Sequence, residues 1–229
     1  MQTIPILNLL YMLFPLVIVA YFYYKWIGNS VEVPLATLRM VGQLILIGYV
    51  LNFLFANNSM WLGGLIILFM IAVSSLIALR NLEDKNLRSY TILFIAIALG
   101  GSFNLGIVLT FTLDLEPLYR PEIVIPLAGM IYANAMNAVA LGAERFDNEI
   151  KSSLYVDARR VAFKASMIPQ INALLAVGLV SLPGMMTGQI LSGVSPIVAV
   201  RYQIVVMAMV LGSSGISTIL YLLMQKSKD

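Results

Sequence analysis

Polar and helix-breaking residues are concentrated in an otherwise apolar stretch, SLPGMMTGQIL, at positions 181–191. No charged residue lies nearby, so the stretch is expected at membrane depth. Pro183 removes a backbone hydrogen-bond donor, and Gly184 tolerates the bend that results. The carbonyl groups freed by such a break, together with Thr187 and Gln189, would line a passage through the membrane, as in transporters with discontinuous spans.

Close helix packing is a second explanation of the same stretch. Ser181, Gly184 and Gly188 recur at about one-turn spacing and form a face of small residues. The sequence alone leaves both explanations open. If the passage carries a metal ion, Met185 and Met186 would serve as soft thioether ligands beside oxygen ligands, because the chain has no His and no Cys. The metal ligand set itself stays unknown.

Two amide side chains share a helical face in the preceding apolar segment. Asn134 and Asn137 are three residues apart, and Glu144 continues the same face to the end of the segment. Such a face points into protein or water rather than into lipid. We therefore expect a substrate pathway that is faced by Asn134, Asn137 and the polar residues of 181–191.

The longest polar segment, Glu144–Lys164, has apolar residues at helical spacing: Phe146, Ile150, Leu154, Ala158 and Val161. This pattern predicts one amphipathic helix, which either lies in the membrane interface or docks a partner protein. For the docking alternative, the expected contact residues are the charged ones: Glu144, Arg145, Glu149, Arg159 and Arg160.

Several chemistries are excluded by the residue types. Without His and Cys there is no imidazole or thiolate catalysis, and no Lys follows a Gly, so a phosphate-binding GxxxxGK[ST] loop is absent. We expect no enzyme activity, no cofactor and no nucleic-acid partner. Asp114, Glu116 and Glu122 form an acidic loop that could attract cations, although such loops are most often only solvated.

The composition points to a protein that spans the membrane many times. The chain is 60% hydrophobic and only 11% charged, with a mean hydropathy of +0.92. Soluble domains carry about 25% charged residues. Spans of about 20 apolar residues predict an all-α, polytopic fold of about seven transmembrane helices in a single transmembrane domain, 1–229. The expected spans are 4–24, 38–56, 60–79, 90–113, 122–143, 167–190 and 202–224.

The basic residues predict the orientation. With the N-terminus outside and the C-terminus inside, every Lys and Arg except Arg120 and Arg201 lies on the inner side. This distribution obeys the positive-inside rule. The competing count, which splits 165–200 into two short spans, would send Lys226 and Lys228 outside.

Three segments resemble the FetB-type permeases, the membrane subunits of a small ABC transporter family linked to iron export in bacteria, with plant relatives linked to aluminium tolerance. The segments are RMVGQLILIGYVL (39–51), VIPLAGMIYANAMNAVALGAERF (124–146) and INALLAVGLVSLPGMMTGQILSGVSPIVAVRYQIVV (171–206). The resemblance implies a permease homodimer in the cytoplasmic (inner) membrane that binds two ATPase subunits and exports iron or another metal ion.

Two other functions are consistent with the residues: a stand-alone secondary carrier or channel, and a membrane scaffold without transport. Secondary carriers usually hold ionisable residues within their spans to couple ions. Here the deep polar groups are neutral amides and hydroxyls, which favours a permease driven by a separate ATPase.

Overall fold

The computed structural model describes residues 5–57, 59–117 and 119–225, nearly all of them helical. The elements are α1 (Ile6–Leu9), the 3-10 helix η1 (Leu10–Met12), α2 (Leu13–Ile27), α3 (Glu32–Asn57), α4 (Met60–Leu79), α5 (Leu87–Ile107), the π-helix η2 (Val108–Thr112), α6 (Pro121–Glu149), α7 (Tyr155–Ala176), α8 (Gly184–Leu191) and α9 (Pro196–Met224). No strand occurs among the described residues, and the all-α fold class is confirmed.

The chain divides into two compact units, Met1–Asn57 and Asn58–Asp229. In the first unit, a short turn joins α2 to α3. Gly28 ends α2 with a φ of 82°, a left-handed conformation that is open to glycine. The side-chain oxygen of Asn29 then accepts hydrogen bonds from the N–H groups of Val31 and Glu32, at 3.1 and 3.2 Å. The expected single domain over the whole chain stays a prediction.

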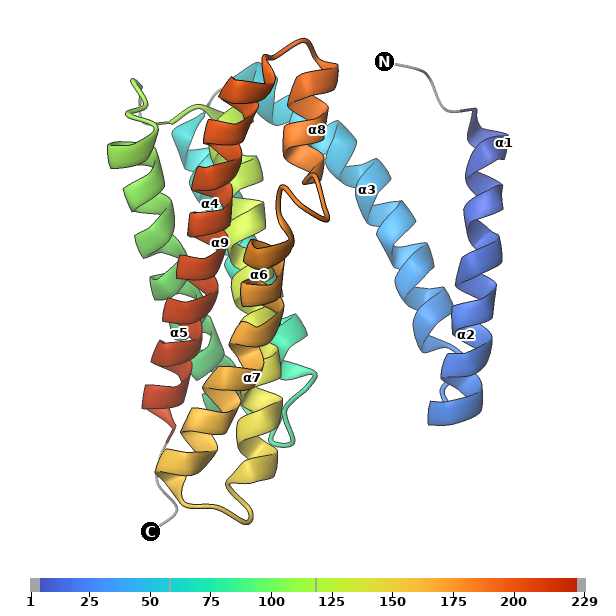
Figure 1. The fold of residues 1–229 in the computed structure, drawn as a ribbon, viewed down its shortest axis with the longest axis vertical. Helices are drawn as coiled ribbons and strands as arrows, with labels where there is room; N and C mark the ends of the chain where they lie inside the picture. Colours follow the sequence, from blue (N-terminus) through green and yellow to red (C-terminus); the bar gives the residue numbers. More distant parts are fainter. Residues whose placement is uncertain (1–4, 58, 118, 226–229) are drawn as a thin grey trace. The chain divides into compact units, whose positions relative to one another are not determined.

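In the second unit, α4, α5, α6 and α9 form a helical bundle, against which α7 and α8 pack (Figure 1). Local sequence signals set the starts of these helices. Ser59 and Asn86 cap α4 and α5, each by accepting a hydrogen bond from the N–H group three residues later. Pro121 and Pro196 occupy the first turns of α6 and α9, where a missing N–H group does not break the helix.

Small residues bring α5, α6 and α9 into close contact. A Cβ added at Gly100 of α5 would overlap Ser217 of α9, and one at Gly101 would overlap the ring of Tyr132 in α6. Four hydroxyl residues of α9 are fully buried in this region: Ser213, Ser214, Ser217 and Thr218. In lipid, helices associate through such close packing rather than through the hydrophobic effect.

The glycines of the 181–191 stretch make no comparable crossing inside one copy of the chain. A Cβ added at Gly184 or Gly188 would meet nothing within 4 Å from elsewhere in the described residues. Contacts within this chain therefore do not support the close-packing explanation of the stretch.

Six segments in the described part of the chain are long and apolar enough to cross a membrane: Leu7–Ile27, Glu32–Phe55, Met60–Leu79, Leu87–Thr112, Pro121–Glu149 and Pro196–Met224. The seventh expected span, 167–190, is not one continuous helix. It consists of the end of α7 and the short α8, with a break between them.

The broken segment still makes the expected return across the bundle. α6 and α9 run in the same direction in Figure 1, so the chain must come back between them, and α7 and α8 make this return in two pieces. The polytopic helical class is confirmed. The sidedness of the two termini stays a prediction.

The single amphipathic helix predicted over Glu144–Lys164 is wrong. α6 continues to Glu149, whose carbonyl oxygen accepts hydrogen bonds from the N–H groups of Ser152 and Ser153 and closes a turn. Leu154, in the middle of the expected stripe, is extended and 77% exposed. Phe146 lies in α6 and Ile150 is the C-cap residue of that helix, whereas Ala158 and Val161 lie in α7. Both helices pack on the same core, which explains why these positions looked like one stripe in the sequence.

Candidate substrate pathway and coupling surface

The break between α7 and α8 is a structured turn. Gly178 adopts a φ of 80° and donates a hydrogen bond to the carbonyl oxygen of Ser181 at 3.0 Å. Pro183 is extended and forms the N-cap of α8. Its carbonyl oxygen accepts hydrogen bonds from both the N–H group and the hydroxyl of Thr187, at 3.0 and 3.2 Å. Pro183 and Gly184 therefore start the short helix, and the chain breaks before them.

α8 separates two pockets. Met185 and Gln189, one turn apart, line a pocket of about 250 Å³ between α6, α8 and α9. Met186 lines a different pocket of about 500 Å³, between the end of α7, the break and α9. Thr187 is exposed. The predicted pathway residues of the stretch thus point in three directions.

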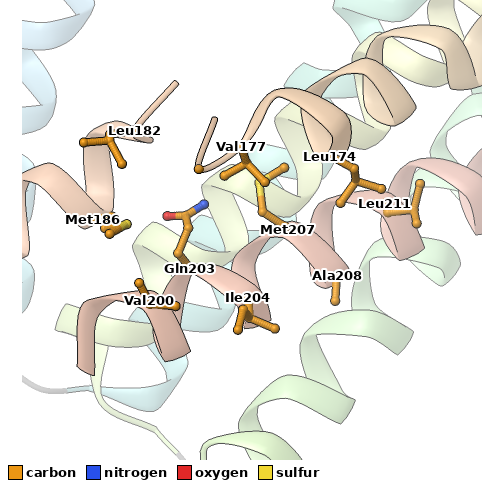
Figure 2. Close-up of a pocket in the computed structure, with 11 residues that line it drawn as sticks. Leu174, Val177, Leu182, Met186, Val200, Gln203, Ile204, Met207, Ala208 and Leu211 are labelled. Carbon is orange, nitrogen blue, oxygen red and sulfur yellow. The ribbon is translucent and has the colours of Figure 1, made fainter. Parts of the chain in front are cut away.

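The larger pocket is almost entirely apolar, and one polar side chain points into it. Figure 2 shows the amide of Gln203, from α9, beside Met186 and Met207. Gln203 is only 5% exposed, and its side-chain oxygen has no hydrogen-bond partner among the described residues. Gln203 was not among the residues expected from the sequence, although an amide within the expected span 202–224 was a signal that could have identified it.

The smaller pocket brings the acidic loop and the 181–191 stretch together. Glu122 of α6, Gln189 of α8 and Tyr202 of α9 supply its polar groups. The side-chain oxygen of Gln189 is buried and has no hydrogen-bond partner in the described part of the chain. Burial raises the pKa of the nearby Tyr119 phenol above its ordinary value, and the negative charge of Glu122 raises it further.

The two asparagines of the expected pathway lie away from both pockets. The amide of Asn134 donates a hydrogen bond to the carbonyl oxygen of Met130 at 2.8 Å within its own helix. Asn137 is exposed, and neither residue lines the pockets beside α8. Gln189 and Glu122 line one pocket, and Met186 and Gln203 line the other. A role of Asn134 and Asn137 in the substrate pathway stays a prediction.

The expected coupling residues gather at the opposite end of the second unit, around the turn between α6 and α7. Arg145 forms an ion pair with Glu149 at 2.6 Å, and Glu144 is exposed. The guanidinium of Arg159 lies 5.5 Å from the ring centre of Tyr155. The other two predicted arginines, Arg159 and Arg160, line a groove of about 340 Å³ between α7 and α9. The remaining lining residues are apolar: Val156, Phe163, Ile219, Leu222 and Leu223.

The loop between α4 and α5 is fastened to the same turn. Glu83 forms an ion pair with Lys151, and its N–H group donates to the Asp147 carboxylate at 3.4 Å. Tyr155 reaches the end of α9, where its hydroxyl donates to the carbonyl oxygen of Leu222 at 2.8 Å. These contacts, which sequence spacing gave no means of finding, join three parts of the chain into one surface.

The helices, their apolar exposure and their number define the class: the chain is a multi-pass α-helical membrane protein. It belongs to the uncharacterised protein family UPF0014, whose model matches residues 6–228. No solved structure matches the chain.

Named relatives confirm the resemblance to FetB-type permeases. The chain is 33% identical over 199 residues to the probable iron export permease protein FetB of Escherichia coli, covering 80% of this chain and 75% of the relative. It is 32% identical over 194 residues to Protein ALUMINUM SENSITIVE 3 of Arabidopsis thaliana, covering 77% and 69%. It is also 33% identical over 197 residues to the UPF0014 membrane protein slr1647 of Synechocystis, covering 79% and 76%.

Proposed function

We propose that the chain is the membrane permease subunit of an ABC transporter in the inner membrane, which exports iron or another metal ion and is driven by a separate ATPase subunit. The observation that carries this proposal is the similarity, over most of both chains, to a relative named as a probable iron export permease. The permease subunit itself is not the enzyme of such a complex.

The broken crossing supports a transport role. Helices interrupted within the membrane place polar backbone at a binding site, and they do so in many transporters. Here the short helix after the break, α8, lines two pockets, and each pocket includes a buried amide oxygen, of Gln189 or Gln203, that has no hydrogen-bond partner among the described residues. A neutral amide oxygen binds a cation during passage without holding it too tightly to leave.

The surface formed by the α6–α7 turn supports coupling to an ATPase. It gathers charged side chains from three parts of the chain, and the contacts of Glu83 with Lys151 and Asp147 hold them in place. In this proposal the ATPase contacts are those expected from the sequence: Glu144, Arg145, Glu149, Arg159 and Arg160. Arg159 and Arg160 border an apolar groove that suits a partner side chain.

The exposed break supports a homodimer. Leu179 and Val180 are 89% and 85% exposed. They belong to the non-helical backbone between α7 and α8, within the expected span 167–190. Irregular backbone at membrane depth requires cover by protein or a water-filled cavity. A second permease copy would provide that cover.

The test is transport by the reconstituted complex. The full chain is co-expressed with the ATP-binding subunit that purifies with it, and inside-out vesicles are supplied with Fe²⁺ under anaerobic conditions. ATP-dependent metal uptake into the vesicles is expected. Uptake that is driven by an ion gradient without ATP would indicate a secondary carrier, and an absence of both uptake and a bound ATPase would indicate a scaffold.

A further inference from the structure

The pocket between α6, α8 and α9, here called the Glu122 pocket, collects several metal-binding atoms. The residues that line it include Glu122, Gln189, Tyr202 and Met185, whose side chains carry a carboxylate, an amide, a hydroxyl and a thioether. Three helices contribute these groups, and the remaining lining residues are apolar. Its volume of about 250 Å³ has room for a cation with part of its hydration shell, since each water occupies about 30 Å³.

Gln189 is placed for a ligand that the chain itself does not supply. Its amide oxygen is buried, yet no donor in the described residues reaches it. A buried acceptor without a partner is unfavourable. A cation in the pocket would satisfy this oxygen.

The backbone of α6 has a carbonyl group without its usual helical donor at this end of the helix. Pro126 also lines the pocket, and it lies inside α6. Proline has no N–H group, so the carbonyl oxygen of Glu122, four residues earlier, lacks its usual helical donor. The residue that carries the only carboxylate of the pocket therefore also presents a freed backbone carbonyl at the same end of α6.

The charge of the pocket favours a cation. Glu122 is the only ionisable carboxylate among the lining residues, and the two basic residues expected on this side, Arg120 and Arg201, do not line it. A simpler role for Glu122 is to stabilise the N-terminus of α6 through the helix dipole. That role explains the carboxylate but leaves the buried oxygen of Gln189 without a reason.

We propose that the Glu122 pocket is a binding site for a divalent first-row transition-metal cation such as Mn²⁺ or Fe²⁺, held by Glu122, Gln189 and Met185. The inference rests on the proposed function, and it assigns a substrate-binding site at the predicted outer end of the bundle. Oxygen ligands suit Mn²⁺, and a thioether adds affinity for softer ions of the same row. With only one carboxylate, the site would bind the cation weakly. A transport pathway requires weak binding, because the ion must be able to leave again.

Mn²⁺ binding to the full chain in lipid nanodiscs tests the site directly, with free Mn²⁺ followed by electron paramagnetic resonance. Glu122→Gln removes the charge at constant size, and Gln189→Leu removes the buried oxygen. Glu116→Gln is the matched control, because it makes the same change at a carboxylate in the loop just before α6 that does not line the pocket. Thermal unfolding of each variant verifies that it is folded.

The expected result is Mn²⁺ binding that weakens at least tenfold in Glu122→Gln and in Gln189→Leu and is unchanged in Glu116→Gln. Equal binding by the wild type and both pocket variants would overturn the proposal, as would an absence of Mn²⁺ binding by the wild type. Because this assay needs neither ATP nor the ATPase, its failure is distinguishable from failure of the proposed function, which ATP-driven uptake measures.

Discussion

The Tyr155 hydroxyl, in the first turn of α7, donates hydrogen bonds to the carbonyl oxygens of Leu222 and Gln225 at the end of α9, at 2.8 and 3.1 Å. One side chain thereby fixes the start of α7 to the C-terminal end of the bundle. Tyr155→Phe should lower the free energy of unfolding by about 1 kcal/mol, measured by denaturant titration in detergent. Tyr90→Phe is the control, because the Tyr90 hydroxyl has no hydrogen-bond partner in the described chain; equal losses in both variants would contradict the proposed contact.

The contact between Gly100 and Ser217 predicts a position-specific effect of alanine. A Cβ at Gly100 would overlap Ser217, including its backbone nitrogen, so α5 and α9 must separate. Gly100→Ala should destabilise the protein by about 1–3 kcal/mol. Gly106→Ala, in the same helix, meets nothing within 4 Å and should be neutral or stabilising by up to about 1 kcal/mol. Thermal unfolding in detergent compares the two variants, and an equal response would argue against tight α5–α9 packing.

Single cysteines can measure the topology without background, because the chain has none of its own. Ser152→Cys should react with a membrane-impermeant maleimide only after the cells are permeabilised. Glu116→Cys and Ser192→Cys should react in intact cells. Labelling of residues 152 and 192 from the same side would mean that the segment formed by α7 and α8 does not cross the membrane. The prediction of seven crossings would then be wrong.

Charge reversal at the groove between α7 and α9 tests ATPase coupling. Replacing Arg159 and Arg160 by Glu should weaken association with the ATPase by about 2–5 kcal/mol, as expected when buried charge pairs at an interface lose a partner. Lys164→Glu changes an exposed base on the same helix outside the groove and should have a smaller effect. Co-purification measures the outcome. Full retention of the ATPase by the double variant would exclude the groove as its binding site.

Leucine substitutions separate a passage from a packing device. Asn137→Leu and Gln189→Leu remove polar groups at similar size, and each should abolish ATP-driven transport while the complex stays assembled. Gln189→Leu should not lower stability, because it removes a buried oxygen that has no hydrogen-bond partner in the described part of the chain. Gly184→Leu is the contrast: dissociation of the complex by this variant, with normal transport by the other two, would identify the stretch as a contact between copies.

Much of the fold was predictable because lipid allows few solutions. Charge-free windows and the polar turn before Met60 gave the expected span 60–79, and this is α4 to the residue. Some other spans were predicted too short: 122–143 stops before the end of α6 at Glu149, and 202–224 begins after the start of α9 at Pro196. Glu149 still lies within α6, since a helix continues into the interface as long as its backbone hydrogen bonds are satisfied. Charge alone marks the edge of the hydrocarbon, not the end of the helix.

The 181–191 stretch could be singled out from the sequence, but the grouping of its residues could not. Met185 and Met186 were expected to act together, whereas the structure places Met185 and Gln189 at one pocket and Met186 at another. Sequence spacing could not reveal that Glu122 lines the pocket of Met185 and Gln189, because this grouping depends on how α6 and α8 each pack against α9. The Glu144–Lys164 stripe failed for a related reason: two helices that pack on one core can imitate the pattern of a single helix.

The break after Ala176 also has a mechanical meaning. Seven non-helical residues connect α7 to the eight-residue α8, which has Met185 at one pocket and Met186 at the other. If α8 rotated on this connection, both pockets would change shape together, because one short helix contributes to both. The interlocked glycines and hydroxyl residues of α5, α6 and α9 belong to other helices and would not have to move.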